Sequence, residues 1–411
     1  MKTQFKSICV VGLGYIGLPT AAVFANRGIK VHGVDVRADV VAIINKGKIH
    51  IEEPGLDVAV HAAVSSGNLR ASTRPQPADA FILAVPTPFK EGRQPDLQFV
   101  DAATESIAPV VQKGNLVILE STSPPGTTER VAAILAAKTR LKPGDLLFAH
   151  CPERVLPGRT MEELISNDRI IGGLTPEAGQ RARDLYSIFA VGQLLLTNAR
   201  TAELTKLVEN SYRDVNIAFA NELSVICEKL GVSVWETIAL ANHHPRVKIL
   251  SPGPGVGGHC IAVDPWFIVA MAPAEAKLIR AAREVNDAKP HFVASRILAL
   301  ASKVNAGRAE VLLLGLTYKP DVDDFRGSPS LEIARDLTAR LDNRVAVHDP
   351  FLTKDSRARE GLHVAAELDK ALARAKVVAL LVDHKPYKEL DPARLKGKAL
   401  VDTRGLWSKR R

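Results

Sequence analysis

A glycine-rich turn near the N-terminus constrains the fold of this 411-residue chain more than any other feature. The apolar run Ile8 to Val11 leads into Gly12-Leu13-Gly14-Tyr15-Ile16-Gly17, and a helical pattern follows. This G-x-G-x-x-G spacing between a strand and a helix is the fingerprint of dinucleotide binding. Gly12 permits the tight turn, Gly14 lets the backbone approach a pyrophosphate, and Gly17 lets the helix pack on the strand. The helix N-terminus then faces the phosphates.

An acidic residue at the end of the second predicted strand indicates which dinucleotide binds. Asp35 follows the run Val31 to Val34 and stands 18 residues after Gly17. A carboxylate at this point accepts hydrogen bonds from the adenosine ribose and repels a 2′-phosphate. The sequence therefore predicts NAD, with NADP as the alternative because Arg37 is nearby.

The alternation of short apolar runs with helical patterns predicts an α/β fold in two parts with helices between them. Residues 1–200 form the predicted NAD-binding Rossmann domain with a parallel sheet. Residues 201–305 form a central helical domain that carries a cysteine loop, with one long helix from Thr201 to Leu230 and a second helical block from Ala274 to Lys303. Residues 306–411 form a smaller Rossmann-like domain without the three-glycine pattern. The expected strands are Ile8 to Val11, Val31 to Val34, Ala80 to Val85, Leu116 to Leu119, Leu146 to Phe148, Val311 to Leu314, Val345 to His348, Val377 to Leu381 and Ala399 to Val401.

The composition restricts the partners of the chain. There are 54 Lys and Arg against 45 Asp and Glu, a net charge of +9, but no basic run is interleaved with aromatic residues. We therefore expect an acidic small molecule and no nucleic acid. No stretch of about 20 apolar residues is present, so we expect no membrane span. Four widely spaced cysteines without a CxxC pair predict neither a metal site nor disulfides, and a cytoplasmic location.

Three groups of polar residues are candidates for chemistry. Thr87 and Thr122 lie at ends of predicted strands, where their hydroxyls either meet cofactor or water or cap turns. Lys206, Asn210 and Arg213 recur at offsets of four and seven, so they share one face of the long helix, which is either a binding surface or a solvated face.

Cys260 is the clearest candidate for a reacting group. It follows Gly257-Gly258-His259 in a loop too rich in glycine and proline for a helix or strand, and Asp264 stands four residues later. Most cysteines without a disulfide are inert packing residues, but a glycine-dense loop favours a presented nucleophile. Beside a nicotinamide cofactor, a cysteine captures an aldehyde as a thiohemiacetal, and a second hydride transfer yields a thioester that water hydrolyses.

The motifs, in their order along the chain, resemble those of the nucleotide-sugar 6-dehydrogenases. They are the fingerprint, Pro86-Thr87-Pro88, Ser121-Thr122, Pro152-Glu153-Arg154, the Lys206 helix, Gly257-Gly258-His259-Cys260 and Tyr318-Lys319-Pro320. The segments Cys151 to Gly158, Phe219 to Leu223, His244 to Val247 and Pro252 to Trp266 are similar to the branch that acts on UDP-N-acetyl-D-mannosamine. The resemblance implies a four-electron, NAD-dependent oxidation of that UDP-sugar to its uronate, for surface or envelope polysaccharide.

The resemblance also implies roles for individual residues. Cys260 would be the nucleophile and Lys206 the proton donor and acceptor, while Asp264, Glu153 and Thr122 would assist proton transfer or hold the hydrolytic water. The expected cofactor contacts are Gly12, Gly14, Tyr15, Ile16, Gly17, Asp35, Thr87, Thr122, Thr128 and Arg326. The expected substrate contacts are Arg154, Val155, Lys206, Asn210, Arg213, His244, Arg246, Gly257, Tyr318, Lys319 and Arg404. The long helix would form a homodimer, and the neighbouring subunit can supply an arginine.

Two departures from the family pattern and three alternatives remain. Asp402-Thr403-Arg404-Gly405 has arginine where the family has lysine, and Gly327 stands where glutamate is frequent. The same chemistry on UDP-N-acetylglucosamine or UDP-glucose is the first alternative. A two-electron β-hydroxyacid dehydrogenase needs no cysteine, and a non-catalytic NAD sensor needs neither Cys260 nor Lys206.

Overall fold

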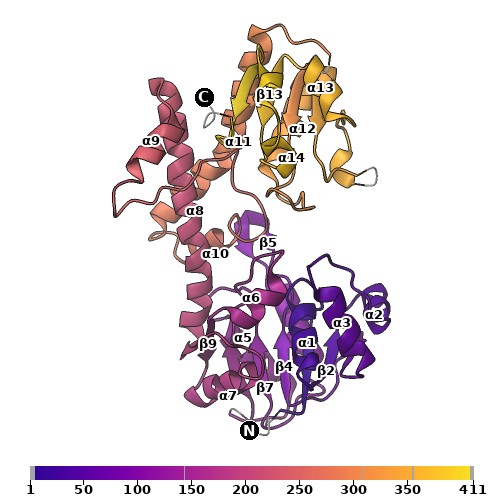
Figure 1. Cartoon of the computed structure of the whole chain (residues 1–411). Helices are drawn as coiled ribbons and strands as arrows, with labels where there is room; N and C mark the ends of the chain where they lie inside the picture. Colours follow the sequence, from indigo (N-terminus) through magenta and orange to yellow (C-terminus); the bar gives the residue numbers. More distant parts are fainter. Residues whose placement is uncertain (1–4, 143, 309, 354–355, 408–411) are drawn as a thin grey trace. The chain divides into compact units, whose positions relative to one another are not determined.

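The computed structural model describes residues 5–142, 144–308, 310–353 and 356–407. Contacts within the chain define two units, Met1–Glu209 and Asn210–Arg411, which are described separately here (Figure 1). The long helix α8, Ala199–Leu230, contributes to both units.

An eight-stranded sheet forms the centre of the first unit, with the order β10-β9-β8-β7-β4-β1-β2-β3. Six neighbouring strands of this sheet, β8-β7-β4-β1-β2-β3, have the Rossmann order, so the predicted fold is confirmed. All neighbours pair in parallel except β8 with β9. The strands are β1 Ser7–Val11, β2 Lys30–Val34, β3 Leu69–Ser72, β4 Ala80–Leu83, β7 Leu116–Leu119, β8 Leu147–His150, β9 Arg169–Gly173 and β10 Leu194–Asn198, and a small hairpin pairs β5 Phe89–Lys90 with β6 Gln94–Pro95.

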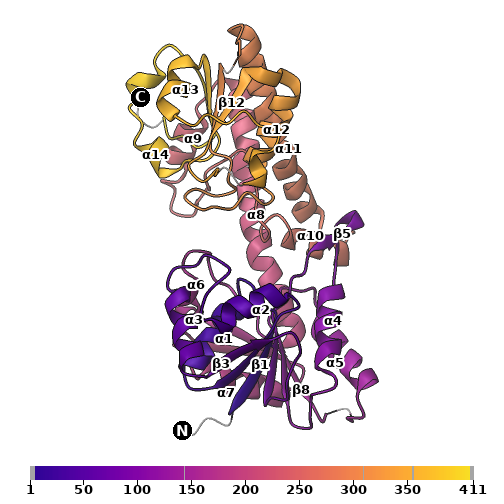
Figure 2. The same ribbon diagram turned by 90° about the vertical axis from the view of Figure 1, so that its right-hand side faces the viewer.

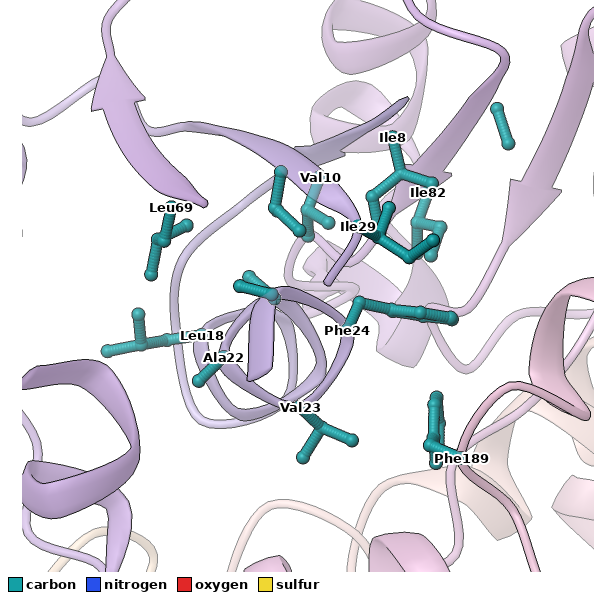
Figure 3. Packing of buried hydrophobic residues seen from close by; sticks show 14 of the residues in the cluster. Ile8, Val10, Leu18, Ala22, Val23, Phe24, Ile29, Leu69, Ile82 and Phe189 are labelled. Carbon is teal, nitrogen blue, oxygen red and sulfur yellow. The ribbon is translucent and has the colours of Figure 1, made fainter. Parts of the chain in front are cut away.

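Helices cover both faces of this sheet because successive side chains of a strand point to opposite sides. Ile8 and Val10 of β1 pack with Leu18 and Phe24 of helix α1 on one face (Figure 3), whereas Cys9 packs on the other. Figure 2 shows α4 and α5 on the side of the sheet opposite α1 and α3. The helices are α1 Gly17–Asn26, α2 Ala38–Asn45, α3 Leu56–Ser65, α4 Gln98–Ile107, α5 Thr127–Lys138, α6 Thr160–Ser166 and α7 Pro176–Tyr186.

Strands β3, β9 and β10 were not predicted from the sequence, and β9 shows the physical reason. It contains Gly172 and Gly173, which disfavour strands. A Cβ on Gly172 would lie 2.6 Å from Cβ of Ala202 in α8, and one on Gly173 would lie 2.4 Å from the backbone nitrogen of Gly179 in α7. The glycines are therefore needed for close packing of helices on the strand, which residue periodicity does not reveal.

A four-stranded parallel sheet with the order β12-β11-β13-β14 lies in the second unit, as expected for a smaller Rossmann-like domain. Helices α11 and α12 cover one face, and α13 and α14 the other. The strands are β11 Val311–Leu314, β12 Val345–His348, β13 Val377–Leu380 and β14 Ala399–Asp402. The helices are α11 Lys277–Lys303, α12 Pro329–Leu341, α13 Leu368–Arg374 and α14 Lys385–Lys388.

The helical segment contains two short helices that were not predicted. Both α9, Val234–Ala241, and α10, Asp264–Met271, flank the cysteine loop. The predicted long helix is confirmed, and Gly231 at φ 71° ends it. Within the described ranges, no helix combines the length and apolarity that crossing a membrane requires.

Candidate active site

The glycine turn of the first unit has the geometry that its sequence predicts. Gly12 has φ 93°, a conformation that favours glycine. A Cβ on Gly17 would lie 1.8 Å from the Gly12 carbonyl oxygen, so only glycine lets α1 begin this close to β1. The first turn of α1 carries no acidic side chain, which leaves its positive end available to an anion.

The space and the polar groups around this turn fit NAD. A Cβ on Gly14 would meet no atom within 4 Å, so the backbone is open to a pyrophosphate there. Half-buried Asp35 is held by the Leu13 N–H at 3.1 Å and the Arg37 N–H at 2.9 Å. The Arg37 guanidinium forms an ion pair with Asp39 at 2.5 Å, so it is already engaged by a carboxylate rather than reserved for a 2′-phosphate.

Asp35 gives a prediction about cofactor choice. We expect Asp35→Asn to lower the ratio of kcat/KM for NAD to that for NADP about tenfold or more, because the amide removes the charge that repels a 2′-phosphate. Asparagine retains one side-chain oxygen and so keeps one of the two backbone hydrogen bonds, whereas Asp35→Ala loses both. Initial rates with both cofactors test this. An unchanged ratio in both variants would contradict the ribose assignment.

Thr87 and Thr122 lie after the carboxyl ends of β4 and β7, whereas Thr128 lies at the start of α5. Thr87 donates its hydroxyl to the Thr122 carbonyl oxygen at 2.7 Å, which brings these two segments together. Thr128 is 1% exposed and donates its hydroxyl to Glu203 of α8 at 2.6 Å. The side chain of Thr128 therefore joins α5 to α8, and its cofactor contact remains a prediction. Tyr15 and Ile16 lie at the start of α1, and Tyr15 is 46% exposed.

Glu153, Arg154 and Val155 follow β8 at the same edge of the sheet. Glu153 is 9% exposed, and its Oε1 accepts the Arg154 N–H at 2.8 Å. The Arg154 guanidinium forms an ion pair with Glu209 of α8 at 2.7 Å and also donates to the Asp168 carbonyl. Val155 is half-buried. A carboxylate and a cation are thus fixed where parallel α/β sheets bind ligands.

The polar stripe of α8 comprises Lys206, Asn210 and Arg213. Lys206 is half-buried and Arg213 exposed, while Asn210 is 8% exposed. Asn210 Nδ2 donates to Asp264 Oδ2 at 2.5 Å. This contact ties the stripe to the residue at the start of α10, four positions after Cys260.

Cys260 is exposed, whereas Cys9, Cys151 and Cys227 are buried. The N–H groups of Val263 and Asp264 donate to the Cys260 carbonyl at 3.0 and 2.9 Å, which forms the turn into α10. The exposure of Cys260 is what a presented nucleophile requires, and its catalytic role stays a prediction. Nearby, burial lowers the pKa of His259, and the positive charge of Arg326 lowers it further despite Asp324 at 3.6 Å.

The glycines before Cys260 have a structural use that the sequence analysis missed. Cβ atoms on Gly257 and Gly258 would each lie 3.0 Å from Tyr318, and one on Gly255 would lie 2.9 Å from Pro329. The loop therefore packs closely against the segment that follows β11. Glycine here brings the cysteine loop to Tyr318 as well as leaving backbone exposed.

Some of the remaining predicted ligands of the second unit are held by neighbouring groups, and others are exposed. The Thr317 hydroxyl donates to the Lys319 carbonyl at 2.8 Å and fixes the turn after β11. Arg326 forms an ion pair with Asp324 at 2.7 Å, and Arg404 one with Asp383 at 2.9 Å. His244 and Arg246 are exposed on the loop after α9.

Several buried contacts of α8 carried no local sequence signal. Glu203 accepts the N–H of Gly126 at 2.7 Å and that of Thr128 at 2.8 Å. Buried Arg283 of α11 forms an ion pair with buried Asp214 of α8 at 2.6 Å. Their partners lie far away along the chain, so spacing alone could not find them.

Three family models cover the chain one after another. The NAD binding domain of the UDP-glucose/GDP-mannose dehydrogenase family matches residues 6–190, the central domain residues 200–288 and the UDP binding domain residues 312–409. The chain belongs to the UDP-glucose/GDP-mannose dehydrogenase family. It is an NAD-dependent dehydrogenase, so the predicted family, enzyme class and cofactor are confirmed.

Relatives of this dehydrogenase match it over nearly its whole length. NDP-N-acetyl-D-galactosaminuronic acid dehydrogenase of Ralstonia nicotianae is 52% identical and aligns with 99% of the chain and 98% of its own length. UDP-N-acetyl-D-mannosamine dehydrogenase of Yersinia pestis is 53% identical, with 98% and 100% covered. The solved structure of UDP-D-ManNAc dehydrogenase from Pyrococcus horikoshii is 40% identical, has a TM-score of 0.88 and covers 97% and 96%.

Proposed function

We propose that this dehydrogenase oxidises C6 of UDP-N-acetyl-D-mannosamine twice and releases UDP-N-acetyl-D-mannosaminuronate for surface or envelope polysaccharide. The observation that carries the four-electron chemistry is the exposure of Cys260, the one cysteine of four that solvent reaches, in a chain whose other unit binds NAD. A two-electron alcohol dehydrogenase needs no such thiol. The choice of sugar is supported by the names of the Yersinia and Pyrococcus relatives.

The covalent steps use Cys260. Removal of the C6 hydroxyl proton and of one hydride gives an aldehyde. The Cys260 thiolate then adds to the aldehyde carbon and gives a thiohemiacetal, and loss of a second hydride from that carbon gives a thioester. NAD, when bound, supplies the hydride acceptor for both oxidations. Water then adds to the thioester carbonyl, the carbon–sulfur bond breaks, and the uronate and the thiol are released.

Lys206 is the proposed proton carrier of the oxidation steps. It would accept the C6 hydroxyl proton and return a proton as later intermediates form, a task for a positioned side chain. Asn210 lies one turn further along α8 and holds Asp264 at 2.5 Å. Asp264 would thereby be oriented to assist proton transfer near Cys260.

Glu153 is the proposed base of the hydrolytic step, with Thr122 holding the water. Each carboxylate oxygen of Glu153 has one donor, the Arg154 N–H or the Arg169 guanidinium, and two acceptor positions. Capacity therefore remains for a proton from water. Thr122 is half-buried at the end of the neighbouring strand β7.

The substrate carries a diphosphate, and the proposed substrate contacts include several cations. Charge-assisted hydrogen bonds from arginine suit phosphate oxygens. We assign the UDP-sugar to Arg154, Val155, Lys206, Asn210, Arg213, His244, Arg246, Gly257, Tyr318, Lys319 and Arg404. In this assignment residues 1–200 bind the cofactor, residues 201–305 carry the chemistry, and residues 306–411 bind the nucleotide. Arg326 is assigned to the cofactor.

A homodimer through α8 is supported by a stripe of apolar side chains on that helix. At about 100° per residue, the stripe covers an arc of about 80°, on the side opposite Lys206 and Asn210. An exposed, mainly apolar helix face is typical of a protein interface. The side chains, each at least 41% exposed, are Leu204, Val208, Tyr212, Phe219, Ile226 and Leu230. Exposed Arg246 would then be available to the neighbouring subunit.

The dimer gives a prediction about mass in solution. We expect the purified protein to have twice its chain mass of 44.3 kDa by light scattering, and Val208→Arg to have the mass of one chain. A buried arginine without a partner opposes association. Val58→Arg, the same substitution at an exposed position of α3, outside this helix, serves as the control. A wild-type protein of single-chain mass would contradict the proposal.

A cytoplasmic location is proposed because the thiol of Cys260 stays reduced there.

The sugar itself is tested by comparing kcat/KM for several UDP-sugars. We expect kcat/KM to be higher for UDP-N-acetylmannosamine than for UDP-N-acetylglucosamine, UDP-N-acetylgalactosamine or UDP-glucose. A site that hydrogen-bonds the correct substituents rejects analogues that leave its polar groups unpaired. The galacto sugar is included because the Ralstonia relative is named for the corresponding uronic acid. Preference for it would keep the mechanism and overturn the proposed substrate.

A further inference from the structure

Two buried carboxylates of the first unit share one guanidinium. Arg169, the first residue of β9, is 3% exposed, and its Nη2 donates to Glu153 Oε2 at 2.8 Å. Its Nη1 lies 3.8 Å from Oε1 of Glu120, which directly follows β7 and has a side chain with no exposed surface. Glu153 follows β8. Three adjacent strands of the sheet, β7, β8 and β9, thus bring their charged groups together.

The guanidinium is fixed from several directions. Its central carbon lies 4.4 Å from the centre of the Tyr186 ring of α7 and 5.6 Å from that of Phe189. Nη2 also donates to the Leu164 carbonyl at 3.2 Å. Stacking of a planar guanidinium on an aromatic ring is a property of arginine that the compact ammonium of lysine lacks. Arg169 therefore determines where the Glu153 carboxylate points.

Glu120 is the second anchor of this group. Its Oε1 accepts the Tyr186 hydroxyl at 3.0 Å, and its Oε2 accepts the Thr20 hydroxyl of α1 at 3.4 Å. Burial raises the pKa of Glu120 to about 7, and the charge of Glu153 contributes to the increase, whereas Arg169 opposes it. The charge of this buried group therefore changes near neutral pH.

Stability alone does not account for the arrangement. Buried ion pairs contribute little net stability, and a second buried carboxylate against one guanidinium is unfavourable when both carboxylates are ionised. A carboxylate with a raised pKa, such as Glu120, is typical of functional sites. Here one of the two carboxylates is the proposed base of thioester hydrolysis.

We propose that Arg169 is a positioning residue that orients the carboxylate of Glu153 for the hydrolytic step. Glu120, through its own charge, sets the net charge around Arg169 and Glu153. This inference rests on the proposed function, since it concerns the step in which water replaces the Cys260 sulfur. The proton released from that water goes to Glu153. Neither Arg169 nor Glu120 contacts the substrate in this account.

The experiment follows Arg169→Lys with substrate in excess, through the first turnover and into the steady state. We expect a burst of two NADH per active site at close to the wild-type rate, followed by steady turnover about 10- to 100-fold slower than in wild type. Hydroxylamine should trap the accumulated thioester as a hydroxamate on the sugar. Arg159→Lys is the control, because Arg159 is exposed and paired with Glu162 at 2.8 Å outside this group, and it should behave as wild type.

The outcomes separate this inference from the proposed function. A wild-type enzyme that releases one NADH per sugar would overturn the proposed function. A wild-type enzyme that releases two, combined with an Arg169→Lys variant that hydrolyses its thioester at the normal rate, would overturn only the positioning role. Equal slowing of burst and turnover would indicate a merely structural role and would also overturn it.

Glu120→Gln gives an independent test that does not depend on folding of an arginine variant. The groups facing Glu120 are Thr20, Cys151, Glu153, Arg169 and Tyr186. Ionised Glu120 strengthens Glu153 as a base, so the wild-type hydrolysis rate should increase through pH about 7. The variant should lack this inflection while its burst rate is unchanged. Persistence of the inflection would contradict the role of Glu120.

Discussion

Cys260→Ser is expected to reduce uronate formation by at least about a thousandfold, because a serine hydroxyl has no thiolate form to capture the aldehyde and gives no thioester. NAD binding should be unaffected, since the cofactor turn lies in the other unit. Measurement of uronate by chromatography and of NAD affinity by fluorescence tests both parts.

A matched control comes from a buried cysteine. Cys227→Ala removes a sulfur that is 3% exposed in α8, so it should alter packing slightly and leave turnover unchanged. Iodoacetamide should label Cys260 in the native wild-type protein well before the three buried cysteines, as their exposure indicates. Full uronate production by Cys260→Ser would disprove the covalent mechanism.

Lys206→Ala is expected to lower kcat about 100- to 1,000-fold, the range that general acid–base catalysis contributes. Lys206→Arg separates charge from proton transfer, because arginine keeps the cation but does not release a proton near neutral pH. We expect the arginine variant to keep a KM close to wild type and to remain as slow as the alanine variant.

The control for the lysine lies on the same helix. Lys229 is exposed in the last turn of α8, and Lys229→Ala should leave kcat and KM unchanged. If Lys206→Ala raises KM but leaves kcat unchanged, the lysine binds substrate without moving a proton, and its catalytic assignment is wrong.

The parts of the molecule that the sequence predicted correctly are governed by local geometry. Gly12 and Gly17 are required by a turn of six residues, so their spacing was sufficient to identify them. The long helix could be delimited because Gly231 ends an uninterrupted helical pattern. Asp35 could be identified because it comes directly after β2, where a ribose-binding carboxylate is expected.

The parts that were missed depend on contacts between distant segments. Gly258 was interpreted as part of a loop that presents Cys260, but it also packs against Tyr318, 60 positions further along the chain. Arg169 was not singled out because its partners Glu120 and Glu153 come from other strands. Pattern periodicity records which face a residue occupies, but it contains no information about which distant side chain lies opposite.

The central claim, four-electron oxidation through a thioester on Cys260, is tested most directly by counting NADH against sugar consumed. The purified protein is incubated with excess NAD and a limiting amount of UDP-N-acetylmannosamine until the reaction ends. The account predicts two NADH and one uronate for each sugar. One NADH for each sugar, with an aldehyde as product, would contradict it.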